Sequence, residues 1–260
     1  MKKSRGRWWA WIFIILGTLY FFLPLLATFV FSLKAKLGTL SFQAYINIFN
    51  DPQFLWNFGF SILWAILTII VGILLLVPTA FVIRLKVPKA RTPVEFITLL
   101  PFVIPPIVYV FGLVRTYSHP PLQIINSAGL LIAAYTILSM PYMYRAVDTG
   151  LRSIDVRTLT EAAQSLGAGW GTILFRVILP NIRTAILSGA FLSFAIVVGE
   201  LIVAQYLVKP AFAPYMAYQI QQKAFEPAAM AIISFALTWV AMGIIQMVGR
   251  GRGIQVGGGH

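Results

Sequence analysis

The sequence predicts an all-α protein that crosses a lipid bilayer six times, and two observations carry this prediction. Of its 260 residues, 59% are apolar and only 10% are charged, whereas about 25% of the residues in a soluble domain are charged. Six long apolar runs alternate with basic segments. Each run has about the 20 residues that a helix needs to cross a bilayer, and all are too long and too continuously apolar for barrel strands.

The six apolar runs place the expected membrane-spanning helices within one transmembrane domain, 1–260. The first run follows a basic N-terminus but is too long for a signal-peptide core, and no small-residue cleavage site follows it. We therefore expect a retained helix with Trp8, Trp9 and Trp11 at the membrane interface. In chain order, the expected spans are about 8–33, 58–83, 95–115, 124–145, 183–208 and 227–249.

The distribution of Lys and Arg predicts that both ends of the chain lie inside the cell. With the N-terminus inside, fifteen of the 20 Lys and Arg fall in inner segments and five in outer ones, which is the bias that the positive-inside rule describes. The same distribution argues against nucleic-acid binding, because the basic residues form no continuous face. Whether the last residues, Gly257–His260, belong to the natural protein stays open.

Counting chemically active side chains excludes most enzymes. The chain has no cysteine and two histidines, His119 and His260, so we expect no disulfide, no thiolate or histidine metal centre and no Ser-His-Asp triad. We expect His119, in a Ser-His-Pro-Pro sequence, to be a solvated turn residue. A membrane-embedded enzyme would need clustered His, Asp or Glu. A stand-alone secondary transporter would need coupling-ion ligands and usually an internal repeat, and the sequence shows neither.

Two expected spans contain unusual residues. Pro101, Pro105 and Pro106 interrupt the third span, which predicts a kinked helix, either lining a pore or simply packed in protein. Glu200 lies within the fifth span, where a carboxylate is costly unless it is paired or hydrated. It either contacts a cationic substrate or makes a structural hydrogen bond. We take Glu200, Pro105, Pro106 and Tyr109 as candidates for a substrate pathway.

The long inner connection 145–183 has an amphipathic helical pattern that glycines interrupt. This pattern predicts two short helices that meet at a glycine turn near Gly167. At the inner end of the fourth span, we expect Asp148 to form an ion pair with Arg145 or Arg152 rather than to bind substrate.

Within this connection, Glu161-Ala-Ala-Gln-Ser-Leu-Gly167 is followed by Val177-Ile-Leu179-Pro180. This segment resembles the cytoplasmic coupling loop of the permeases of ABC importers. The family's pattern is Glu-Ala-Ala, three residues, Gly, nine residues, Ile, one residue, Leu-Pro; only Val177 departs from it, conservatively. The resemblance covers most of the chain. It implies a coupling loop over 155–180 and a permease fold of the MetI-like type.

The resemblance implies a non-catalytic permease subunit of the bacterial plasma membrane. Its partners would be a dimer of ATPase subunits, a second permease that is homologous or identical, and an extracytoplasmic solute-binding protein. ATP and Mg²⁺ would bind the ATPase, because this chain has no Gly-Lys pair and thus no phosphate-binding loop. It implies no cofactor on this chain. The coupling residues would be Glu161, Ala162, Ala163, Gly167, Leu179 and Pro180.

Elementary chemistry agrees with docking at this loop. The two consecutive alanines would give a flat helix surface, Gly167 would let the backbone reverse, and Glu161 could pair with a basic partner residue. The alternative is a helical hairpin that lies on the membrane and packs only on this chain's own spans.

The solute is predicted less specifically. The chain resembles most the permease branch for spermidine and putrescine, with iron(III), thiamine and phosphonate permeases as alternatives. Two outer segments, 42–49 and 209–222, are rich in aromatic and amide side chains. Each forms either a lid or docking surface for the solute-binding protein, or an interfacial helix on lipid headgroups; both interpretations stay open.

Overall fold

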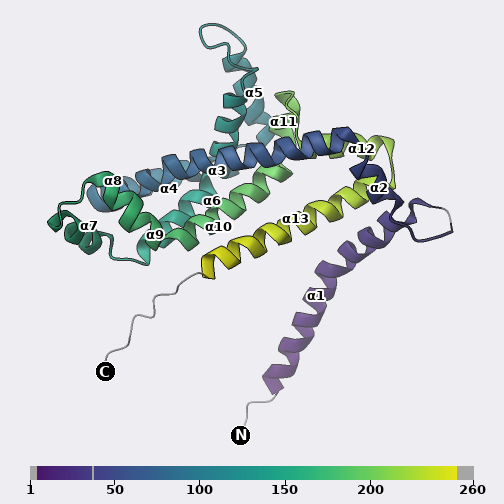
Figure 1. Cartoon of the computed structure of the whole chain (residues 1–260), viewed down its shortest axis with the longest axis horizontal. Helices are drawn as coiled ribbons and strands as arrows, with labels where there is room; N and C mark the ends of the chain where they lie inside the picture. The colour runs from purple at the N-terminus through teal and green to yellow at the C-terminus, as the bar shows by residue number, and fades with distance from the viewer. Residues whose placement is uncertain (1–4, 37, 251–260) are drawn as a thin grey trace. The chain divides into compact units, whose positions relative to one another are not determined.

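The computed structural model describes residues 5–36 and 38–250, which form helices and their connections (Figure 1). The chain divides into two compact units, one built from Met1–Leu55 and Tyr215–Trp239 and the other from Trp56–Pro214 and Val240–His260. Lys2, Lys3, Arg252 and the questioned residues Gly257–His260 lie outside the described residues.

The first unit contains the first expected span and the first outer segment. Its elements are α1 (Arg5–Ser32), η1 (Leu33–Ala35), α2 (Gln43–Phe49), the start of α3 (Pro52–Lys86), most of α12 (Phe212–Gln222) and the first part of α13 (Phe225–Arg250). Almost all of α1 is exposed, which suits a helix whose apolar surface faces lipid or another protein. The helix expected in 42–49 is present as α2.

Polar contacts in this unit join α12 to Asp51, which lies between α2 and α3, and join α2 to α13. The Tyr215 hydroxyl donates to Asp51 Oδ2 at 2.6 Å, and Gln219 Nε2 donates to the Tyr215 hydroxyl at 2.7 Å. Burial, followed by the hydrogen bond to Asp51, raises the pKa of Tyr215 to about 12. Asn47 of α2 donates to Glu226 at the start of α13 at 3.0 Å. These contacts tie the expected outer ends of several helices together.

The second unit holds the remaining helices. They are the rest of α3, η2 (Pro88–Ala90), α4 (Arg91–Val103), α5 (Pro106–Tyr117), α6 (Ala128–Arg152), α7 (Val156–Ser165), α8 (Trp170–Thr172), η3 (Ile173–Ile178), α9 (Leu179–Asn181), α10 (Arg183–Gly199) and α11 (Ile202–Tyr206). Its core runs from α3 and α6 to α7, η3 and α10. Gly150 and Gly189 lie where α6 and α10 approach each other closely, as small residues allow in membrane proteins.

Four helices are long and apolar enough to cross a membrane, or up to six if each of two bent helix pairs is one span. The expectation of a single kinked helix over 95–115 is wrong, because α4 and α5 meet at a bend of 100°. The cause is local. Ile104 is extended, as residues before a proline prefer, and Pro105 and Pro106 have no N–H to continue the helix.

The expected fifth span, 183–208, is also not one helix. It begins after a break at Ile182, where the helical segment Trp170–Asn181 and α10 are bent by 78°. It ends at Gly199, and Glu200 is extended before the short helix α11. Glu200 therefore lies at a break between two helices rather than inside a continuous one.

Candidate coupling site

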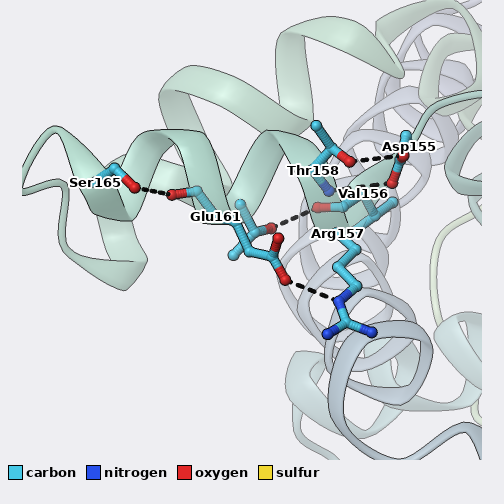
Figure 2. A network of polar contacts seen from close by, with 7 residues as sticks. Asp155, Val156, Arg157, Thr158, Glu161 and Ser165 are labelled. Carbon is cyan, nitrogen blue, oxygen red and sulfur yellow. Dashed lines mark hydrogen bonds and ion pairs between the residues drawn. The ribbon is translucent and has the colours of Figure 1, made fainter.

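The helix α7 begins with a side-chain cap. Asp155 Oδ1 accepts a hydrogen bond from the Thr158 N–H at 3.1 Å, and the Thr158 hydroxyl donates to Asp155 Oδ2 at 2.8 Å (Figure 2). This is the N-cap arrangement that satisfies a free N–H at a helix start. The backbone bond, then the hydroxyl bond, hold the pKa of the Asp155 carboxyl below its ordinary value. The sequence thus fixes where α7 starts.

The two faces of α7 have different environments. Val156, Thr160 and Ala163 are buried, and the Thr160 hydroxyl donates to the Val156 carbonyl at 2.6 Å. On the outer face, Arg157 Nε donates to Glu161 Oε1 at 2.8 Å (Figure 2), and Ala162 is exposed. Successive helical residues are about 100° apart, and on α7 Ala162 lies on the outer face with Glu161, whereas Ala163 lies on the inner face. The expectation that Ala162 and Ala163 form one outer surface is wrong, because Ala163 packs into the core.

The end of α7 is a glycine-dependent turn. The Ala168 N–H donates to the Ala163 carbonyl at 3.0 Å, and the Gly167 N–H donates to the Gln164 carbonyl at 2.9 Å. Gly167 has φ +79°. These are the bonds and conformation of a Schellman motif, for which glycine is preferred. The predicted turn at Gly167 is confirmed. The preceding residue, Leu166, is 89% exposed.

The second arm of the loop returns into the core. Its middle, η3, is a π-helical segment in which Ile173 and Ile178 are completely buried. Lys86 at the end of α3 places its ammonium 4.0 Å from the centre of the Trp170 ring, a cation–π contact. Leu179 packs against the same core, whereas Pro180 is exposed. The second arm of the hairpin, α8 to α9, thus packs against α3 and holds the hairpin in place.

An ion-pair cluster lies where α6 ends. Asp148 Oδ2 accepts from Arg152 Nε at 2.8 Å and also pairs with Arg152 Nη2. Arg91 Nη2, at the start of α4, lies 3.4 Å from the same oxygen. The predicted pair with Arg152 is confirmed. Arg145 is exposed and takes no part in this cluster, and Arg91 was not predicted because the chain order separates it from Asp148.

The candidates for a substrate pathway have different local roles. Glu200 accepts from the backbone N–H groups of Ile202 at 2.9 Å, Val203 at 2.9 Å and Ala204 at 3.3 Å. Its carboxylate therefore caps α11, which is a structural hydrogen-bonding role within its own segment. From the sequence alone, a single glutamate in an apolar run gives no signal that distinguishes a helix cap from a free carboxylate.

Tyr109 lies in the other broken segment. Its hydroxyl donates to the Ala134 carbonyl at 3.5 Å, and its ring helps to line an apolar cavity of about 240 Å³. Pro105 and Pro106 are exposed at the bend before it. The helices α5 and α11, which follow the two breaks, are in contact through Phe111 and Tyr206, whose ring centroids are 5.1 Å apart. Through residues 5–36 and 38–250, no group of three His, Cys, Asp or Glu converges on a metal site.

The Asp155 cap leads to a pH prediction. Because the folded-state pKa of Asp155 is lowered, its contribution to the stability of α7 is present above about pH 4, the ordinary Asp value, and is lost as the pH falls through the lowered value. As the pH falls from about 4 through the lowered pKa of Asp155, we expect the amides of α7 to lose hydrogen-exchange protection while those of α6 keep theirs. In Asp155→Asn, which keeps a capping oxygen without the charge, this pH dependence should vanish; an unchanged acid profile would contradict the assignment.

These features define a helical membrane protein with an exposed, rigid hairpin between two membrane-embedded segments. Residues 77–252, more than half of the chain, match the family "Binding-protein-dependent transport system inner membrane component". The chain belongs to this family, whose members are the non-catalytic permease subunits of ABC importers, and it is a multi-pass protein of the inner membrane.

Individual relatives are moderately similar. The molybdate/tungstate transport system permease protein WtpB of Pyrococcus furiosus is 29% identical over 207 residues, covering 78% of this chain and 81% of that protein. The spermidine/putrescine transport system permease protein PotB of Haemophilus influenzae is 28% identical over 185 residues, covering 65% of this chain and 63% of that protein. Substrate names therefore differ among relatives of similar identity.

A solved structure supports the fold. The chain is similar to one from a bacterial ABC transporter involved in the import of the acidic polysaccharide alginate, with a TM-score of 0.70 and 16% identity, covering 95% of this chain and 99% of that chain. This likeness concerns the arrangement of the helices alone.

Proposed function

We propose that this chain forms half of the translocation pathway of an ABC importer and is driven through the hairpin of α7 to α9. The observation that carries the proposal is the geometry of α7. Its inner face is fixed in the core by Val156, Thr160 and Ala163, while its outer face presents Glu161 and Ala162. A helix that is rigid on one side and presents a small, flat patch on the other is suited to dock into a groove of a second protein.

The same packing explains how a movement of the loop could reach the membrane. Ile173 and Ile178 of η3 belong to the core that also contains Phe81 of α3 and Val147 of α6. The Lys86–Trp170 contact adds a second link to α3. Because packed cores move as units rather than deform continuously, an ATPase that pulls on α7 would tilt the attached helices as a body.

The proposed assembly contains two ATPase subunits that bind ATP and Mg²⁺, a second permease that is homologous or identical, and a solute-binding protein. Both ends of this chain and the hairpin lie on the cytoplasmic side, as the positive-inside bias favours. On the opposite side, α2 and α12 offer the surface for the solute-binding protein. The six-span topology adds two crossings to the four long helices: one that contains α4 and α5, and one that contains α10.

For the solute, we propose an oxyanion of the molybdate or tungstate type. WtpB, named for these anions, matches over most of both chains. The Glu200 carboxylate accepts hydrogen bonds from backbone N–H groups of its own segment, which explains its presence there without a cationic substrate. The second candidate is a polyamine, which the similarity to PotB favours. Uptake of labelled molybdate and of labelled spermidine by cells that express the whole transporter, with each unlabelled solute as competitor, separates the two.

The variant Ala162→Arg tests the docking role. The new cation would be forced into a close protein contact without a partner, which is costly, so we expect at least about a tenfold loss of affinity for the proposed ATPase subunit. Co-purification in mild detergent, followed by titration of the purified ATPase, measures this loss.

Gln123→Arg provides the control, because it adds the same charge at an exposed loop residue between α5 and α6. It should bind the ATPase normally. Membrane insertion and the thermal melting of both variants should equal those of the parent protein. Retention of the ATPase by Ala162→Arg at parental affinity would remove the basis of the proposal.

A further inference from the structure

A basic cleft lies beside the hairpin, within the second unit. Its volume is about 740 Å³, and it is bounded by the end of α3, the start of α4, the end of α6 and the start of α7. Four arginines line it, namely Arg84, Arg91, Arg152 and Arg157. The apolar run of α3 ends at Ile83, and both Ile83 and Arg84 belong to the lining. The cleft is therefore at the level where membrane-embedded segments give way to charged ones.

The positive charge of this cleft is not neutralised by its own acids. The lining contains two acids, Asp148 and Asp155. Asp148 is already engaged by Arg152 and Arg91, and Asp155 is engaged by Thr158 in the α7 cap. The fourth arginine, Arg157, is paired with Glu161, so the four arginines exceed these three carboxylates by one positive charge.

Two of the arginines have donors without an acceptor. Among the described residues, Arg84 makes no hydrogen bond or ion pair. The Arg91 Nε is buried and has no hydrogen-bond partner, although an unpaired buried donor costs free energy. Guanidinium donors in a concave site are typical of phosphate recognition, which often uses two parallel N–H···O bonds. The donors of this cleft would therefore fit an anion of the phosphate type.

The remaining lining indicates what carries this anion. Ala80, Ile83, Leu85, Pro88, Ile154 and Val156 form apolar walls beside the guanidinium groups. A site with both kinds of wall, at the membrane surface, suits an amphiphile whose phosphate meets the arginines and whose acyl chain meets the apolar side chains. We propose that the cleft binds the headgroup phosphate of an anionic membrane lipid. The proposal depends on the membrane location of the spans and not on the docking of an ATPase.

The test uses the purified full chain in detergent and native mass spectrometry. Phosphatidylglycerol, phosphatidylcholine and inorganic phosphate are titrated separately. We expect phosphatidylglycerol to bind more tightly than phosphatidylcholine and to raise the melting temperature, which inorganic phosphate at equal concentration should not do. Arg84→Gln should weaken phosphatidylglycerol binding about fivefold, the effect of one cationic contact at a membrane surface, and Arg84→Glu should weaken it further.

The matched control is Arg176→Gln, which removes the same charge from an exposed position of η3 outside the cleft. It should change the affinity less than about twofold, since its charge does not face the site. The lipid-free melting temperature of Arg84→Gln should equal that of the parent, because Arg84 makes no internal bond.

Several outcomes would overturn the proposal. Equal binding of the two lipids would show that the cleft does not select an anionic headgroup. Equal losses in Arg84→Gln and Arg176→Gln would show only general attraction to negative charge. Stabilisation by inorganic phosphate alone would assign the cleft to a free anion. If Arg84→Gln lost the ATPase but kept phosphatidylglycerol, the cleft would be a protein interface.

Discussion

Gly150→Val is expected to destabilise the folded chain by about 3 kcal/mol, near the upper end of the usual cost of overpacking. A Cβ at Gly150 of α6 would lie 2.5 Å from the Ala185 Cβ and 3.2 Å from the Ile182 Cβ. Carbon atoms pack best at about 3.5–4.0 Å, and neither neighbour can rotate away because both are first side-chain atoms. The two helices would have to separate, which disrupts the core that also holds the hairpin. Thermal unfolding in detergent, followed by circular dichroism, measures the loss.

The control for this prediction is on the same helix. A Cβ at Gly129 would meet only Ser127 Oγ, at 3.9 Å, which is ordinary contact. Gly129→Val should therefore melt near the parental temperature, because valine is no worse than glycine in a helix. If Gly150→Val and Gly129→Val melted together, α6 and α10 would not be in close contact in the folded protein.

Trp64→Ala is expected to destabilise the chain by about 3 kcal/mol. Trp64 of α3 is 6% exposed, and its indole Nε1 donates to the Pro210 carbonyl at 3.0 Å. One turn earlier, the Ser61 hydroxyl accepts from the Phe212 N–H at 2.7 Å, so this face of α3 anchors the connection that leads into α12. Trp→Ala in a protein core costs about 3–5 kcal/mol. We expect the lower end of this range, because lipid rather than water surrounds helices that separate in a membrane, so the exposed apolar surface costs less free energy.

The same helix supplies a matched control for the tryptophan. Trp56 of α3 is 60% exposed, and Trp56→Ala should change the unfolding midpoint only slightly. Trp64→Phe should give an intermediate result, because the ring volume is mostly kept while the Pro210 carbonyl loses its donor, at a cost of about 1 kcal/mol. A Trp64→Ala variant as stable as Trp56→Ala would contradict the anchoring role.

The hairpin was largely predictable because its signals are local. Asp155, Thr158 and Gly167 specify a start and an end for α7 through bonds that span only a few residues. The fixed spacing from Glu161 to Pro180 led to the family, which the match over residues 77–252 confirms. The docking roles of the six predicted residues stay predictions, because they depend on a partner; the residues are Glu161, Ala162, Ala163, Gly167, Leu179 and Pro180.

The errors arose where a residue's role depends on its surroundings. Ala162 and Ala163 are identical in type, and only the packing of α7 on α3, α6 and η3 makes one exposed and the other buried. Three prolines predicted a kink, but the extended Ile104 and the bend of 100° convert the third span into two helices. For Glu200 the sequence left a substrate contact and a structural hydrogen bond open, and only the break after Gly199 brought three N–H groups to its carboxylate.

The amino-acid sequence by itself determined the membrane class, the approximate positions of the apolar segments and the hairpin with its glycine turn. These follow from short-range quantities: run length against bilayer thickness, charge placement, and capping bonds within one turn. Only the tertiary structure decided which alanine faces outward, that Asp148 also pairs with Arg91, and that four arginines from α3, α4, α6 and the α7 start line one cleft. The physical reason is that these relations join residues far apart in the chain, and only the packing of helices brings them within contact distance.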